Sequence, residues 1–316
     1  MKSVTFLRFL SNIIFVRGSL YGNIFVRGSL YGKWKNRKFR LMYLLRCLIN
    51  PFSSVRYYHE LCSLQSINKI LEIQPTLPAK IHRPYLYKGG LAETRRKNII
   101  GHYRFIQDLP SEYQTFLFPD RDVLLTHFTG KKGEDFYIYC SSGGFDREGE
   151  LMLSLCFKEI PVARLSFSII PTSKGHCAFI GGLQGAPRDI GPDIIRDATK
   201  SCYGLFPKRI VFEALCSLMS CCDIADVLAV SEQSHVFRQL RYRYKKRKCF
   251  VAIYSDFWES VSGRPYGNLY QLPIYVERKS FNELASKKRS EYRKRYSLLD
   301  QIHEDIRRLL KREAKE

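Results

Sequence analysis

The central part of the chain alternates short apolar runs with turn residues, and this alternation limits the possible folds most strongly. Apolar runs of strand character occupy residues 134–144, 149–170 and 175–185. A tight connection from Lys158 to Pro161 divides the second run into two strands. Helical periodicity then covers residues 192–222, with Pro207 at the first turn of a second helix. The pattern predicts a strand meander that is followed by helices.

Further strands are expected at 226–231 and 268–278, the stretch 248–258 is expected to begin as a strand, and Pro273 places the last strand at a sheet edge or bulge. Residues 235–246 form a short basic helix or a loop between the first two. The whole order predicts an α+β fold with a mixed sheet and flanking helices. The GCN5-related N-acyltransferase superfold has the same order, which is an analogy of topology. In that fold the pyrophosphate of acyl-CoA meets backbone amides in a loop after the fourth strand.

Composition divides the chain into four predicted segments. They are a basic N-terminal extension at 1–50, a helical or linker arm at 51–99, an acyltransferase-like domain at 100–276 and a charged C-terminal helix at 277–316. The extension contains the tandem repeat IFVRGSLYG at 14–22 and 24–32, and two copies are too few for a solenoid.

Helical spacing also marks the regions on both sides of the central domain. It covers residues 36–72 with an interruption at Pro51, whereas 73–98, rich in Pro and Gly, is expected to be a linker or an arm over the body. The C-terminal helix either docks on the body or pairs with a partner. Its apolar stripe consists of Tyr292, Tyr296, Leu299, Ile302, Ile306 and Leu309.

The charge of the chain is concentrated in three segments. The chain has 52 Lys and Arg against 30 Asp and Glu, a net charge of +22. Residues 1–50, 238–248 and 276–316 carry this excess, and the first carboxylate is Glu60. Such segments suit an anionic membrane surface, an anionic envelope precursor or, as a weaker alternative, nucleic acid. No RNP motif or zinc finger supports dedicated nucleic-acid binding.

The N-terminus and the cysteines indicate the compartment. Arg8 and Arg17 interrupt the first apolar residues, so neither a secretory signal nor a membrane span is expected. Most of the ten cysteines lie in apolar runs without zinc-ligand spacing, so we expect core thiols in a reducing compartment and no metal. The sequence therefore predicts a cytoplasmic protein, with peripheral association at the inner membrane as a further hypothesis.

Four stretches resemble the VirK/YbjX family of Gram-negative bacteria. They are FIGGLQGAP from 179, IIRDATKSCYGLFPKRIVFEAL from 194, VSEQSHVFRQLRYRYKKRK from 230 and YSDFWESVSG from 254. The resemblance covers about residues 100–310. It implies a link to virulence, envelope remodelling and resistance to cationic peptides, and a role in the production or surface display of a virulence factor. It implies no established reaction.

A glycine-rich stretch before the helix at 192 is the candidate donor site. Glycines let backbone amides approach a phosphate, and a helix N-terminus adds partial positive charge. The superfold pattern, Gln/Arg-x-x-Gly-x-Gly/Ala, differs from this stretch, where Pro187 lies inside the loop. The alternative is an ordinary strand-to-helix turn. The predicted residues for an acyl-CoA are Gly181, Gly182, Gln184, Gly185 and Arg188.

Candidate catalytic residues lie in two places. Glu213 stands in an apolar helical run, where burial would raise its pKa, or it pairs with Arg209 one turn earlier. Ser231 and His235 follow the strand at 226–231, and ligands usually bind at the carboxyl ends of such strands. They form an acid–base pair, or Ser231 caps the next helix.

Alternating Arg and Tyr in RYRYKKRK predict an anion-binding segment, because rings stack and cations contact phosphates. Its residues are Arg241, Arg243, Lys245, Lys246, Arg247 and Lys248. Two functions follow. The first is acyl transfer to an envelope component, and the second is a non-enzymatic accessory protein that binds an anionic partner through its basic segments.

Overall fold

The computed structural model describes residues 32–312 except 66, 119–120, 143, 188 and 240–253. The tandem repeat at 14–32, apart from Gly32, and most of the stretch 248–258 that is expected to begin as a strand lie outside the described residues. Arg188 and the basic segment 241–248 lie outside them as well.

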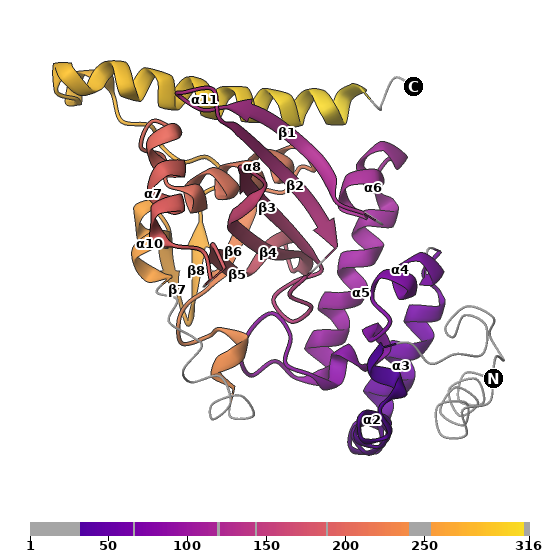
Figure 1. Ribbon diagram of the computed structural model, residues 1–316. Coiled ribbons are helices and arrows are strands. Elements are labelled where there is room, and N and C mark those ends of the chain that lie inside the picture. Colours follow the sequence, from indigo (N-terminus) through magenta and orange to yellow (C-terminus); the bar gives the residue numbers. More distant parts are fainter. Residues whose placement is uncertain are drawn as a thin grey trace.

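A mixed sheet of eight strands forms the centre of the fold, in the order β1-β2-β3-β4-β5-β6-β8-β7 (Figure 1). All neighbours pair antiparallel except β5 and β6, which are parallel. The strands are β1 Val123–Thr129, β2 Asp135–Ser142, β3 Leu151–Phe157, β4 Ile160–Thr172, β5 Gly175–Gly185, β6 Asp226–Val230, β7 Arg264–Tyr266 and β8 Leu269–Leu272.

Helices cover both faces of this sheet. Helices α5 and α8 each pack on β4, and successive β4 residues 165–170 are all buried, which requires cover on both faces. The described helices are η2 Gly32–Lys35, α2 Arg37–Ile49, α3 Pro51–Cys62, α4 Ile67–Ile73, η3 Leu77–His82, α5 Ala92–Asp108, α6 Ser111–Leu117, α7 Pro192–Ser201, α8 Pro207–Cys221, η4 Val236–Arg238, α10 Ser255–Ser260, η5 Phe281–Glu283 and α11 Ser286–Arg312.

The predicted α+β class, the helical N-terminal region and the break at Pro51 are confirmed. Of the two alternatives for the C-terminal helix, docking on the body is correct. Helix α11 lies along one end of the sheet beside α8 and β1 (Figure 1), and it buries Leu299, Ile302 and Ile306. The described part of the molecule contains no helix that is long and apolar enough to cross a membrane.

The structure makes two local predictions more precise. The stretch 248–258 is expected only to begin as a strand, and its end, Ser255–Ser260, forms the helix α10. Residues 77–83 do not form an exposed linker, because all of them are buried against the body. The other alternative, an arm over the body, therefore describes them. Tyr57 in α3 and Leu310 in α11 belong to one continuous hydrophobic core.

Candidate functional site

The strands β5 and β6 part at one point, and we call this place the β5–β6 notch. Their parallel pairing ends at Ile180 and Ala229, whereas β5 continues to Gly185 along β4. At the same point the pairing of β4 with β5 shifts register and leaves Gly181 as an extra residue, which is a bulge. The notch therefore lies at the carboxyl end of β6, beside the only parallel pair in the described sheet.

The side chain of Glu148 fills the notch and is only 1% exposed. Gln184 Nε2 donates to both carboxylate oxygens, at 3.0 and 3.3 Å, and His235 Nε2 lies 3.4 Å from Oε1. A Cβ on Gly181 would overlap the carbonyl oxygen of Glu148, and a Cβ on Gly182 would overlap its carboxylate. The two glycines therefore leave the space that Glu148 occupies.

His235 faces Glu148 with a defined ring orientation. Its Nδ1 accepts a hydrogen bond from the backbone N–H of Phe237 at 3.2 Å, which assigns the proton to Nε2 on the side of Glu148. The ring of Tyr254 lies 5.7 Å away, and its hydroxyl hydrogen-bonds with the backbone of Leu183. Burial raises the pKa of Tyr254, so this hydroxyl keeps its proton at neutral pH.

The surroundings of Glu148 distinguish it from an ordinary surface carboxylate. Within the described residues, no Lys or Arg forms an ion pair with it, and its side-chain neighbours are Gln184 and His235. A buried carboxylate without a cationic partner is costly in free energy. Such groups are retained mainly at functional sites. Glu148, Gln184, His235 and Tyr254 therefore form the candidate site.

Replacing Gly181 with alanine tests the packing of the notch. The new Cβ meets backbone atoms of Glu148, which cannot rotate away, so we expect a loss of at least about 3 kcal/mol in the free energy of unfolding. Gly185→Ala is the matched control in the same strand, because nothing lies within 4 Å of its Cβ position. Urea denaturation at neutral pH measures both. Equal stability of the two variants would contradict this packing.

The predicted donor residues lie in the strand rather than in a loop. Gly181, Gly182 and Gln184 contact or accommodate Glu148, so they do not form a cradle for a pyrophosphate. Among the predicted glycines, only Gly185 has open space around its Cβ position. Arg188 lies outside the described residues. The glycine pair therefore does not fit acyl-CoA phosphates, so an acyl donor at the notch needs another place for its phosphates.

Ser231 supports the turn after β6 but does not cap the next helix, because His235 is the N-cap of η4. Its hydroxyl donates to the carbonyl of Asn268 at 2.8 Å and accepts the N–H of Ser234 at 3.2 Å. The neighbouring Glu232 accepts hydrogen bonds from Ser255 N and Oγ, at 2.6 and 2.7 Å. Although burial opposes ionisation, these bonds lower the pKa of Glu232 overall. The structure thus places His235 at the notch. The hydroxyl proton of Ser231 is instead bound by the carbonyl of Asn268.

Glu213 lies away from the notch on α8 and is held by two cationic partners. It pairs with Arg209 at 2.6 Å and with His303 at 3.3 Å. Burial opposes ionisation, yet the hydrogen bond from His303 and the charge of Arg209 lower the pKa of Glu213 overall. The predicted rise of this pKa is wrong, and the alternative of pairing with Arg209 is confirmed.

Sequence reasoning missed Glu148, the central residue of the site. The available signal was the stretch Arg147-Glu148-Gly149-Glu150 directly before a strand, because two carboxylates so close to a buried strand need partners. Both side chains are 1% exposed. They enter separate polar clusters, which a linear pattern does not show.

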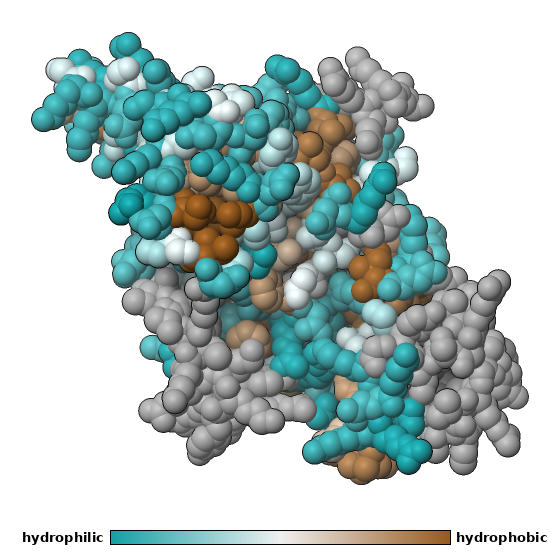
Figure 2. Space-filling model, in the orientation of Figure 1, coloured by the Kyte–Doolittle hydropathy of each residue, from teal (hydrophilic) through white to brown (hydrophobic). Residues whose placement is uncertain are grey.

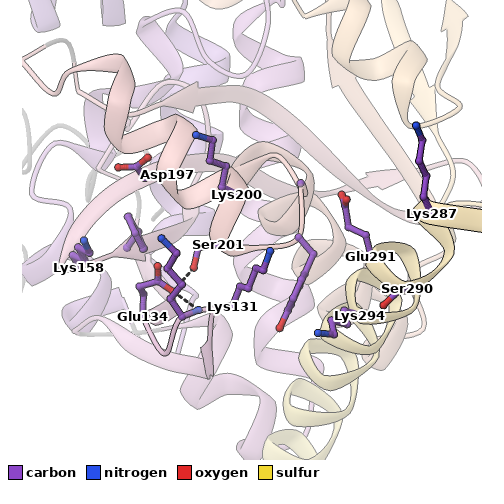
Figure 3. A pocket seen from close by; sticks show the side chains of 14 residues that line it. Lys131, Glu134, Lys158, Asp197, Lys200, Ser201, Lys287, Ser290, Glu291 and Lys294 are labelled. Atoms are coloured by element: carbon purple, nitrogen blue, oxygen red, sulfur yellow. Dashed lines mark hydrogen bonds between the residues drawn. The ribbon is translucent and has the colours of Figure 1, made fainter.

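A second feature is a groove of about 840 Å³ at the end of the sheet, which we call the lysine groove (Figure 3). The loop between β1 and β2, the turn between β3 and β4, the end of α7 and the first turns of α11 line it. Its cations are Lys131, Lys132, Lys158, Lys200, Lys287 and Lys294.

The lysine groove has a net positive charge. Its carboxylates are Glu134, Asp197 and Glu291, against six lysines. Two of these acids are already engaged, because Glu134 accepts from Ser201 Oγ at 2.6 Å and Glu291 pairs with Arg295 at 3.1 Å. The hydrogen bond from Ser201 lowers the pKa of Glu134. No ion pair engages the six lysines within the described residues.

The described residues contain no candidate metal site. No group of three or more His, Cys, Asp or Glu there is placed to hold a metal ion. The nine described cysteines are free, and most of them are buried.

Comparison with known proteins assigns the family. The family described as a protein of unknown function, DUF535, matches residues 32–308. The chain belongs to this family, which is the VirK/YbjX family. It is 39% identical to the uncharacterized protein YbjX of Escherichia coli K12 over 277 residues, 85% of this chain and 82% of that protein.

More distant relatives cover about half of the chain. One uncharacterized protein of Haemophilus influenzae is 32% identical over 46% of this chain and 47% of its own length. A second is 27% identical over 49% of this chain and 50% of its own length. No solved structure matches the chain.

Proposed function

We propose that this member of the DUF535 family transfers an acyl group to an envelope component, with the β5–β6 notch as the reaction site. One observation carries the proposal. The strands β5 and β6, which are the only parallel pair among the described strands, separate beside the buried carboxylate of Glu148. The family resemblance supplies the context, which is envelope remodelling and the production or surface display of a virulence factor.

The strand order supports the acyltransferase analogy. From β3 onward the order is β3-β4-β5-β6-β8-β7, with helices α7 and α8 between the two parallel strands. This is the order of the GCN5-related superfold, which also has one parallel pair. In open α/β sheets, ligands bind at the carboxyl ends of strands where the connection changes direction. The likeness is one of topology, so the chemistry rests on the side chains.

The side chains of the notch supply a base and an acid. In this proposal the oxygen or nitrogen of the acceptor bonds to the acyl carbon while the bond from that carbon to the leaving group breaks. Glu148 takes the proton of the acceptor, Gln184 holds the carboxylate by donating to it, and His235 lies beside it. Tyr254 gives its proton to the leaving group, and solvent exchange then returns both residues to their starting protonation states. Glu148, His235 and Tyr254 are each only 1% exposed, so the reaction requires the residues that cover the notch to move.

Label transfer tests this proposal. The full chain is incubated with acetyl-CoA or palmitoyl-CoA, labelled in the acyl group, and with an envelope extract from cells that lack the protein. We expect label in the extract, and a rate at least about 100-fold lower for Glu148→Gln, because the base is lost. Glu304→Gln is the matched control, since it makes the same change on the exposed surface of α11.

Two results would reject acyl transfer from these donors. One is full activity of a folded Glu148→Gln variant. The other is the absence of transfer by the wild-type chain with both donors, which would favour the second candidate. That candidate is a non-enzymatic accessory protein that binds an anionic partner through basic segments, and the lysine groove favours it because six lysines face one cavity.

A further inference from the structure

Helix α2 and the start of α3 present an apolar stripe to solvent. Leu41, Leu45, Leu48, Ile49 and Phe52 follow one another at helical spacing, and their exposed fractions are 57, 44, 74, 74 and 90%. The opposite side of α2 is anchored, because Tyr43 and Cys47 are buried in a small cluster with Trp34 and Tyr58. Figure 2 shows the apolar surface as a brown area at the lower tip of the molecule, where α2 lies.

Mainly basic side chains accompany this stripe. Lys35, Arg37 and Lys38 are exposed at the start of α2, and no carboxylate precedes Glu60 in the chain. Glu93, which lies near Phe52, already pairs with Arg96. The stripe therefore combines apolar groups with an excess of cations, as interfacial membrane helices do.

A hollow of about 270 Å³ on the flank of α2 adds an anion-binding element. Five of its eight lining residues are basic and none is acidic, and the set is Lys33, Asn36, Lys38, Phe39, Met42, Arg46, Arg83 and Arg147. Arg83 also pairs with Asp146 at 2.9 Å, which fixes the position of its guanidinium. The dimensions and charge of this hollow suit a single phosphate headgroup.

From these observations we propose that the α2 face docks on a bilayer rich in anionic phospholipid. Leu48, Ile49 and Phe52 enter the boundary between headgroups and acyl chains, and the cations of α2 contact the phosphates. Each cation near such a surface adds to the attraction. This inference goes beyond acyl transfer, because it concerns where the protein lies and not what it catalyses.

Charge complementarity favours the bilayer over the other occupants. A second copy of this chain would bring the same predominantly basic face against itself, and like charges repel. Residues 1–31 of the same chain also contain basic residues and no acid. An anionic lipid surface is the occupant that satisfies both the apolar and the cationic groups.

Vesicle flotation with the full chain tests the proposal. The vesicles contain phosphatidylethanolamine and phosphatidylglycerol at a ratio of about 7:3, or phosphatidylcholine alone. We expect flotation with the first vesicles and little with the second. Leu48→Ser with Phe52→Ser, and separately Arg37→Glu with Lys38→Glu, are expected to reduce the bound fraction at least about tenfold.

Two control variants distinguish the α2 face from other causes of flotation. Leu91→Ser removes an equally exposed leucine on α5, 73% exposed, and is expected to leave flotation unchanged. Glu148→Gln is also expected to float like the wild type, so a failure of acyl transfer and a failure of docking are distinguishable. Flotation that survives both α2 variants, or α2 variants that change the sedimentation mass of a dimer instead, would overturn the proposal.

Discussion

Replacing Lys80 with methionine is expected to lower the free energy of unfolding by about 3–5 kcal/mol, because it leaves a buried charge without its partner. Lys80 Nζ lies 2.6 Å from Glu150 Oε1, and the side chains are only 4 and 1% exposed. The hydroxyl of Tyr103 donates to the other carboxylate oxygen at 2.7 Å. Burial opposes ionisation of Glu150, but the charge of Lys80 and the hydrogen bond from Tyr103 lower its pKa overall, so the carboxylate is charged in the fold.

A double-mutant cycle separates the ion pair from packing. Lys80→Met with Glu150→Gln is expected to recover much of the stability that Lys80→Met loses, because a neutral amide keeps the contact with Tyr103 and needs no cation. Lys174→Met, on the exposed turn between β4 and β5, is the control for the change in side chain. Urea denaturation measures all four proteins. A loss below about 1 kcal/mol for Lys80→Met would show that Glu150 needs no cation.

The sequence predicts those parts of the fold whose signals are local. Alternating apolar residues define β3, β4 and β5, and Pro207 stands at the start of α8. The strand β7 has only three residues, all exposed, so no apolar pattern marks it. The sequence contains no helical signal for α10, where Trp258 donates to the carbonyl of Val230 from a helical turn.

The sequence predicted only the part of the candidate site that depends on position along the chain. His235 was found because it follows the carboxyl end of β6, which is a position that sequence order reveals. The glycines at 181 and 182 were noticed, but their role depends on Glu148, which is more than 30 residues earlier and meets them only in the fold. The lysine groove likewise combines four elements from residues 131 to 294.

Acidification from pH 6.5 to pH 4 is expected to destabilise the protein strongly, because two buried histidines stay neutral in the fold. Burial, together with the charges of Arg46 and Arg95, lowers the pKa of His82 to about 4. Burial and the charge of Lys80 lower the pKa of His102 to about 4, against an opposing effect of Glu150. The unfolded chain, with a histidine pKa near 6.5, binds more protons in this range, so stability rises with pH.

The size and window of this effect are testable. One pKa unit corresponds to about 1.36 kcal/mol, so each histidine contributes up to about 3 kcal/mol of destabilisation near pH 4. Carboxylates with a lowered pKa, such as Glu150, also lower the stability of the fold as pH falls. They do so below about pH 4.5, at the acid end of this range. His102→Asn keeps an acceptor for the N–H of Ile169, which now bonds Nδ1 at 3.1 Å. Because this variant cannot be protonated, we expect it to lose about half of the pH dependence between 6.5 and 4 in urea denaturation. An unchanged slope in the variant would mean that folding does not lower the pKa of His102.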